Sequence, residues 1–190
     1  FYKGEIAARI LDFARNTPVP DASGKAHTAL LSASDFAEWR ARAEDTVSVN
    51  YRGLDVHKCG TWTQGPVFLQ QLTLLEGYDL RAMGHNSADY LHVLMEAAKL
   101  AFADREAYYG DPAFVDVPLA TLLSRDYATE RRRLMATHAS RELRPGVIPG
   151  FEDQVARTLA NLPPISSTDR SVQNAEPTAA EMRSPPPGET

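Results

Sequence analysis

Three polar side chains alternate along one short stretch of the sequence and could act together chemically. Asp55, His57 and Cys59 stand two residues apart, so on a strand all three would point from the same face. Such a set could provide a nucleophile, a base and an orienting group, or a small metal site. Neighbours on one strand face are about 6.6 Å apart at Cα, a long reach for a tight triad. We therefore interpret them as polar residues at a strand end that meet solvent.

Two histidines later in the chain give weaker evidence of a functional site. His85 and His92 have no partner at the i, i+4 spacing that lets two histidines share a metal ion, and zinc would need a third ligand as well. We interpret both as capping or surface residues. The sequence therefore predicts no metal site.

A run of charges from Asp104 to Glu106, with Asp111 after it, could form a carboxylate cluster. Such a cluster could perform acid–base work or hold a divalent cation. The run also lies where a helix is expected to turn into a loop, and ion pairs that fix this turn would explain the same residues. We favour the structural interpretation over the catalytic one.

The elements that would position these residues follow from hydrophobic spacing. Apolar residues at helical spacing, with capping residues and turn formers at the ends, predict helices at residues 1–15, 32–42, 66–77, 87–108, 119–123 and 126–138. Alternating β-branched residues predict a strand pair at residues 46–51 and 54–57. Residues 18–24, rich in turn formers, are predicted to form a loop without helix or strand.

The longest predicted helix, residues 87–108, repeats apolar residues at i, i+3, i+4 and i+7. Asn86 is its predicted N-cap, and Ser34 is that of helix 32–42, in which Phe36 and Trp39 are expected to face inward. Helix 66–77 is expected to be buried through Phe68, Leu69, Leu72 and Leu75. We also expect exposed apolar surface on helix 66–77 and on the face from Leu91 to Phe102, because both need partners that this chain lacks.

Composition limits the class of protein. Of the 190 residues, 43% are hydrophobic and 24% are charged, as in a globular domain. A net charge of -5 gives no basic footprint for nucleic acid or an anionic membrane, and no apolar run approaches membrane-spanning length. The single cysteine, Cys59, excludes an intrachain disulfide. The sequence does not distinguish a cytoplasmic protein from a periplasmic or secreted one.

The two ends of the chain differ from its middle in sequence pattern and composition. The chain begins at Phe1, without Met, in a segment already patterned as a helix, so we expect the polypeptide to extend upstream. From Pro163 onward Pro, Ser, Thr, Ala and Glu dominate, and this segment is expected to be flexible and open to cleavage. We therefore divide the chain into a mostly helical part, residues 1–162, and a flexible segment, residues 163–189, that leads to Thr190.

Several longer blocks carry a specific resemblance. In order along the chain they are FYKGEIAARI, NYRG, LLEGYDL, GHNSADYLHVLMEA, KLAFADREAYYGDPAFVDVP and LLSRDYATERR. Their order and spacing, over residues 1 to 133, resemble the second half of the large subunit of the gamma-glutamyltransferase family. The resemblance implies an α+β fold, a mainly helical fragment of an αββα-sandwich N-terminal-nucleophile hydrolase.

The resemblance also implies a chemistry. Such a precursor cuts itself before a threonine, whose freed amine, with a pKa of about 7.7–8.0, can act as base for its own hydroxyl in acyl transfer. Thr190, after the SPPPGE segment, stands where this nucleophile and cleavage site would be, as the first residue of a small subunit; alternatively it simply ends a flexible tail. The implied partners are that small subunit and a γ-glutamyl substrate resembling glutathione, without a cofactor. Substrate-binding residues are expected outside this fragment.

One segment departs from the family pattern. Members carry a proline-rich Ser-Ser-Gly-Gly segment ahead of the buried helix, whereas this chain has Thr61-Trp62-Thr63-Gln64-Gly65-Pro66. Specificity for a γ-glutamyl group is therefore open, and a related acylase or amide hydrolase is an alternative. An inactive family member and a non-catalytic helical interaction module with a disordered tail are further alternatives.

Overall fold

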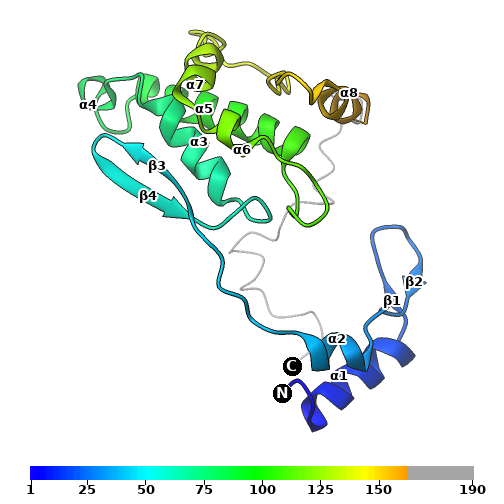
Figure 1. Ribbon diagram of the computed structural model, residues 1–190. Coiled ribbons are helices and arrows are strands. Elements are labelled where there is room, and N and C mark those ends of the chain that lie inside the picture. The colour runs from blue at the N-terminus through cyan, green and yellow to red at the C-terminus, as the bar shows by residue number, and fades with distance from the viewer. Residues whose placement is uncertain (162–190) are drawn as a thin grey trace, which may run out of the picture. The chain divides into compact units, whose positions relative to one another are not determined.

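The computed structural model describes residues 1–161, and the chain divides into two compact units, Phe1–Thr46 and a second that begins at Val47 (Figure 1). The described residues are mainly helical and include two small antiparallel hairpins, which agrees with a mainly helical α+β fragment. Within this range no helix is both long and apolar enough to cross a bilayer. The boundary placed after residue 162 and the segment 163–189 lie outside the described residues.

In the first unit, α1 (Glu5–Asn16) contacts α2 (Ala33–Glu38). Between them β1 (Val19–Pro20) pairs with β2 (Ala26–His27), so the expectation of a loop without strands was wrong. Asp21 closes the intervening turn, because its side chain accepts a hydrogen bond from Ser23 N at 2.8 Å and lies 2.5 Å from His27 Nδ1. Pro20 is tolerated because a proline can stand on the edge of so short a ladder.

The start of α2 is fixed by a capping box. Ser32 Oγ accepts a hydrogen bond from Asp35 N at 3.3 Å, and the Asp35 carboxylate accepts one from Ser32 N at 2.7 Å. The predicted N-cap, Ser34, was wrong, since it already lies inside the helix. Trp39 lies beyond the last helical residue, is exposed and stacks on Tyr2, so it does not face inward as expected.

The second unit opens with the predicted hairpin. β3 (Val47–Tyr51) runs antiparallel to β4 (Leu54–Lys58). Arg52 and Gly53 join them with φ values of 53° and 87°, the left-handed pair that a tight two-residue hairpin turn needs. Asn50 fastens this turn, because its Oδ1 accepts a hydrogen bond from Gly53 N at 3.1 Å.

The hairpin leads into α3 (Gly65–Leu75), the buried helix predicted from the sequence. Pro66 lies in its first turn, where the missing N–H costs nothing. Gly65 permits a close approach to the end of β4, since a Cβ there would lie 2.5 Å from Cys59 O. Leu69 and Leu75 are buried as expected, but Phe68 is exposed.

After the short helix α4 (Leu80–Met83), α5 (Ala88–Tyr108) is the longest helix of the described residues and matches its predicted range closely. Its N-cap is Ser87, whose Oγ accepts a hydrogen bond from Tyr90 N at 3.1 Å. The predicted cap, Asn86, was wrong: its φ is 60°, whereas an N-cap residue adopts extended backbone.

Three helices complete the unit. α6 (Leu119–Leu122) agrees with its prediction, whereas α7 (Arg125–Arg132) ends well before residue 138. α8 (Glu152–Ala160) was not predicted.

Two apolar clusters form the core of the second unit. The first lies where α3 packs against α5 and α7, and it includes Val67, Leu74, Ala97, Leu100 and Ala128 (Figure 1). The second lies at the C-terminal end of α5 and joins it to α6 and α8 through Tyr108, Leu122, Ile148 and Val155.

Candidate functional site

The structure does not bring Asp55, His57 and Cys59 together as a reactive set. Asp55 and His57 are exposed on β4, and Asp55 accepts a hydrogen bond from Asn50 Nδ2 at 2.8 Å across the hairpin. Cys59 is an exposed free thiol beyond the end of the strand. The interpretation of these residues as strand-end polar groups meeting solvent therefore agrees with the structure.

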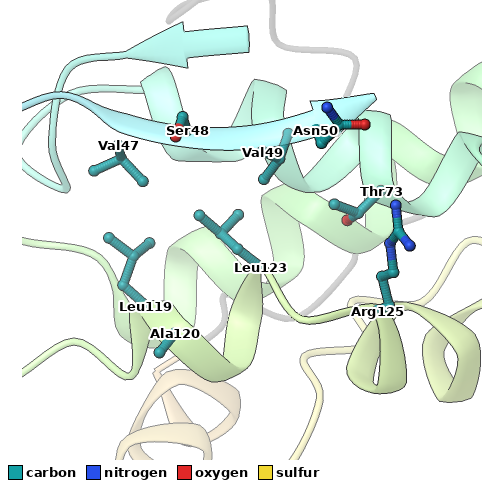
Figure 2. Close-up of a pocket in the computed structure, with 9 residues that line it drawn as sticks. All are labelled: Val47, Ser48, Val49, Asn50, Thr73, Leu119, Ala120, Leu123 and Arg125. Carbon is teal, nitrogen blue, oxygen red and sulfur yellow. The ribbon is translucent and has the colours of Figure 1, made fainter. Parts of the chain in front are cut away.

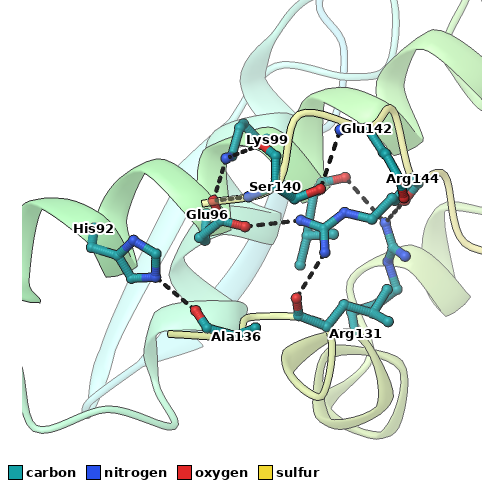
Figure 3. Close-up of polar contacts among 10 residues, drawn as sticks. His92, Glu96, Lys99, Arg131, Ala136, Ser140, Glu142 and Arg144 are labelled. Carbon is teal, nitrogen blue, oxygen red and sulfur yellow. Dashed lines mark hydrogen bonds and ion pairs between the residues drawn. The ribbon is translucent and has the colours of Figure 1, made fainter. Parts of the chain in front are cut away.

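The two later histidines serve the packing of loops and helices. His92 Nε2 lies 2.7 Å from Ala136 O, where the chain leaves α7 (Figure 3). The His85 ring centroid lies 5.8 Å from that of Tyr90. Within residues 1–161, no group of three or more His, Cys, Asp or Glu side chains is arranged to hold a metal ion.

The charged run at the end of α5 separates into an outer and an inner part. On the outside, Arg105 pairs with Glu106 and lies over the Phe102 ring, 4.9 Å from its centroid. Asp111 accepts a hydrogen bond from Ala113 N at 2.9 Å and so shapes the following loop. These contacts fit the structural interpretation of the run, but Asp104 points into the protein and belongs to a different network.

Asp104 is fully buried and accepts hydrogen bonds from four donors on three segments: α3, α7 and the loop that contains Gly146. The donors are Gln70 Nε2 at 2.5 Å, Tyr127 OH at 3.0 Å, Arg131 Nη2 at 3.1 Å and Gly146 N at 2.7 Å. Burial raises the pKa of the Asp104 carboxyl, while Arg131 and the hydrogen bonds oppose that rise. All this bonding capacity is used inside the protein, so the group is suited to holding segments together.

The tyrosines beside Asp104 remain neutral donors. Burial raises the pKa of Tyr127, and the neighbouring Asp104 charge raises it further. Burial likewise raises the pKa of Tyr109. Neither phenol is prepared to give up its proton near neutral pH.

A second buried carboxylate, Glu96, lies two helical turns earlier on α5 (Figure 3). It pairs with Lys99, accepts a hydrogen bond from Arg144 Nη2 at 2.8 Å and accepts another from Ser140 N at 3.3 Å. Burial acts to raise the pKa of Glu96, but the hydrogen bonds from Lys99, Arg144 and Ser140 and the charge of Lys99 outweigh it and leave the pKa below its ordinary value.

The two carboxylates hold down one irregular segment, residues 137–148, which we call the strap. Glu96 binds the strap at Ser140 and Arg144, and Asp104 binds it further along the chain at Gly146 N. Tyr108 OH also donates to Gly146 O at 2.5 Å. A side chain at residue 146 would collide with the Tyr127 hydroxyl, so glycine is needed for this close approach.

Sequence reasoning missed the strap and its partners. The available signal was the placement of Glu96 and Asp104, which lie eight residues apart among the small and apolar residues of α5. Acidic residues on the buried face of a helix require buried partners. The Arg-Pro-Gly sequence at residues 144–146 supplies two of those partners.

A shallow groove runs along β3, with a volume of about 570 Å³ (Figure 2). Val47, Val49, Leu119 and Leu123 make most of its wall apolar, and Asn50 and Arg125 lie at one end. Asn50 is engaged in the hairpin turn, and Arg125 Nη2 lies 3.4 Å from Glu76 Oε1. The lining contains no carboxylate, imidazole or thiol beside the hydroxyls of Ser48 and Thr73, so this groove can accept an apolar group but offers no nucleophile paired with a base.

A match to a family sequence profile shows which protein family this chain belongs to. The sequence profile described as Gamma-glutamyltranspeptidase matches residues 1–165. The chain belongs to the gamma-glutamyltranspeptidase family. The resemblance noted in the sequence is thereby confirmed.

Named relatives within the gamma-glutamyltranspeptidase family are of two kinds. A "Glutathione hydrolase proenzyme" from Pseudomonas sp. (strain A14) is 35% identical over 78% of this chain and 25% of its own length. An "Acylase ACY 1 proenzyme" from Pseudomonas sp. (strain V22) is 37% identical over 66% of this chain and 23% of its own length. The chain thus spans about a quarter of the length of these relatives.

Solved structures of the family are similar to this chain over most of its length. The structure named LmbA2991HD is 46% identical, with a TM-score of 0.69 over 80% of this chain and 25% of that chain. The gamma-glutamyltranspeptidase of Helicobacter pylori is 25% identical, with a TM-score of 0.65 over 77% of this chain and 40% of that chain. The candidate nucleophile of this family member, Thr190, lies outside the described residues.

Proposed function

We propose that this chain is part of a precursor that cleaves itself before a threonine and then transfers a γ-glutamyl or related acyl group. The observation that carries the proposal is the family match over residues 1–165, joined to relatives whose names call them proenzymes. Thr190 is the proposed nucleophile and first residue of the small subunit, because it follows the SPPPGE segment. The large part ending at residue 189 and the small subunit would form a heterodimer.

The proposed chemistry requires the cut. Cleavage frees the α-amine of Thr190, and a backbone amine with a pKa of about 7.7–8.0 can accept the proton of its own side-chain hydroxyl near neutral pH. The hydroxyl oxygen attacks the amide carbonyl of the substrate, the amine leaves with a proton, and an acyl ester on Thr190 remains. Water or an amino group then takes the acyl group and restores the hydroxyl. No step calls for a cofactor.

The proposed fold of the whole enzyme is an αββα sandwich to which this chain contributes mainly helices. The likeness to the Helicobacter pylori enzyme supports this proposal. The residues that bind substrate would come from the parts of the polypeptide outside this chain, which the relatives' lengths indicate to be the larger share.

An amide acylase is the second candidate. It is favoured by the loop Thr61-Trp62-Thr63-Gln64-Gly65-Pro66, which replaces the Ser-Ser-Gly-Gly segment expected of a strict γ-glutamyl enzyme, and by the acylase relative. Two matched anilides distinguish the candidates, one of γ-glutamate and one of glutarate, which lacks the α-amino group. A γ-glutamyl enzyme should release aniline much faster from the first, whereas an acylase should accept the second equally well.

The proposal is tested by expressing the complete gene and following the product on a denaturing gel. The wild-type protein should give two bands whose masses place the cut before Thr190, and amino-terminal sequencing of the smaller band should begin with threonine. Thr190→Ala should give one band and no amidase activity, while Thr190→Ser, which keeps a hydroxyl, should still cleave. A wild-type protein that stays in one piece and yet hydrolyses the anilide at full rate would contradict the mechanism.

A further inference from the structure

The strap has no helix or strand of its own and is held by polar bonds. It lies between α7 and α8, and α5 supplies it with four polar side chains: Glu96, Lys99, Asp104 and Tyr108. The two carboxylates are buried, and the removal of a charge from water costs free energy that apolar packing does not. Buried polar groups that cost stability can select one arrangement of the chain. These contacts therefore indicate that the strap needs one defined place on α5.

The strap is followed by α8, and α8 by the segment that leads to Thr190. Ile148 of the strap and Val155 of α8 are buried together in the second apolar cluster, and α8 contacts α5. The chain is therefore held to α5 as far as the end of α8 at Ala160, about 30 residues before Thr190. Without these attachments the last held residue would be Arg132 of α7, about 58 residues before Thr190.

We propose that the strap acts as a positioning device for self-cleavage, because it keeps the connection between the folded unit and the cleaved bond short. The inference rests on the proposed function, since it requires a cut before Thr190. The effective concentration of a linked group falls roughly as the −3/2 power of the length of the link. Release of the strap and α8 nearly doubles that length, so self-cleavage should become about threefold slower. After the cut this connection no longer leads to Thr190, and the effect should vanish.

The first test releases the strap and follows the cut in the precursor made from the complete gene. The precursor is synthesised in a cell-free system, synthesis is stopped, and a denaturing gel gives the rate of cleavage. Glu96→Gln together with Gly146→Val removes both attachments, because a side chain at residue 146 collides with the Tyr127 hydroxyl. The matched control is Glu142→Gln together with Val147→Ala, two neighbouring strap residues that are exposed.

Brief digestion with trypsin reports the state of the strap independently of the cut. Arg141 lies between Ser140 and Arg144, which Glu96 holds, so trypsin should cut after Arg141 far faster once the strap is released. A second precursor leaves the strap and the fold untouched. About 28 Gly and Ser residues inserted after Pro163 lengthen the connection by as much as release of the strap and α8 would, so the inference stays testable even where the first variant does not fold.

We expect the wild type and the matched control to be cut at one rate, the released variant about two- to threefold more slowly, and the insertion about threefold more slowly. The kcat/KM of every protein after the cut, measured with the anilide, should equal that of the wild type. An insertion that is cut as fast as the wild type would overturn the inference. So would equally fast cutting of the released variant with its strap open to trypsin, or a kcat/KM that falls in step with the cleavage rate. A wild type that is never cut would defeat the proposed function itself, which distinguishes the two failures.

Discussion

At the scale of single residues, the most consequential group of the described chain is Asp104. Its two oxygens receive four donors, from Gln70, Tyr127, Arg131 and Gly146, and no solvent reaches it. A carboxylate satisfies such a set because it only accepts, whereas an amide would turn one donor of its own toward the others. The charge also balances the buried Arg131 guanidinium.

Asp104→Asn should therefore destabilise the fold far more than its small change in shape suggests. Breaking a buried ion pair from one side costs about 3–5 kcal/mol, because the remaining charge is left without a charged partner. The free energy of unfolding in urea measures this loss. Asp111→Asn is the control, since Asp111 is exposed in a loop and should change stability by at most about 0.5 kcal/mol. Equal effects of the two substitutions would show that the buried network contributes little.

At the scale of elements, the two candidate caps of α5 give opposite expectations. Ser87 Oγ accepts the Tyr90 N–H, so Ser87→Ala should cost about 1 kcal/mol of unfolding free energy. Asn86 lies at a φ of 60°, where glycine is at least as comfortable, so Asn86→Gly should be neutral or slightly stabilising. Thermal unfolding of the two variants decides between them, and a larger loss from Asn86→Gly would restore Asn86 as the cap.

The elements also show what the sequence could and could not predict. The hairpin β3–β4 and helices α3, α5 and α6 were predicted because their signals are local: alternation, helical period, Pro at a start and turn formers at an end. The strap was missed because it has no period and is held by contacts with residues of α5 that lie 38 to 48 positions away in the sequence. α7 was predicted too long because residues that favour helices, Arg133 to Ala136, continue beyond its end without Gly or Pro as a stop signal. The candidate site remains a prediction, since Thr190 is outside the described residues.

At the scale of the whole molecule, the second unit taken by itself is closed on one side of α5 and open on the other. The Asp104 and Glu96 networks fill the inner side, and Leu91, Met95 and Phe102 remain exposed on the other. The expectation of exposed apolar surface from Leu91 to Phe102 is confirmed, whereas α3 is largely buried within the second unit and exposes only Phe68 among its large apolar residues. The same periodic pattern predicted the helix correctly but could not tell which of its apolar faces this chain would fill.

The stability of the whole fold should depend on pH through the two buried carboxylates, with opposite signs. The folded-state pKa of Glu96 is lowered, so its contribution is fully present above its ordinary value of 4.5 and is lost as the pH falls through the folded-state value. The folded-state pKa of Asp104 is raised, so its contribution is largest below its ordinary value of 3.8 and declines as the pH rises. Comparing the wild type with Glu96→Gln isolates the first effect, because Asp104 is present in both.

Glu96→Gln should lower the free energy of unfolding by about 2 kcal/mol at pH 7, the scale of hydrogen bonds to a charged group. The gap between the two proteins should narrow steadily below pH 4.5, since protonated Glu96 and glutamine carry the same charge. Urea unfolding at a series of pH values between 3 and 7 measures it, with Glu38→Gln as a control at an exposed glutamate on α2. A gap that stays constant over this range would mean that the charge of Glu96 does not hold the strap, and that packing around residues 140 and 144 does so instead.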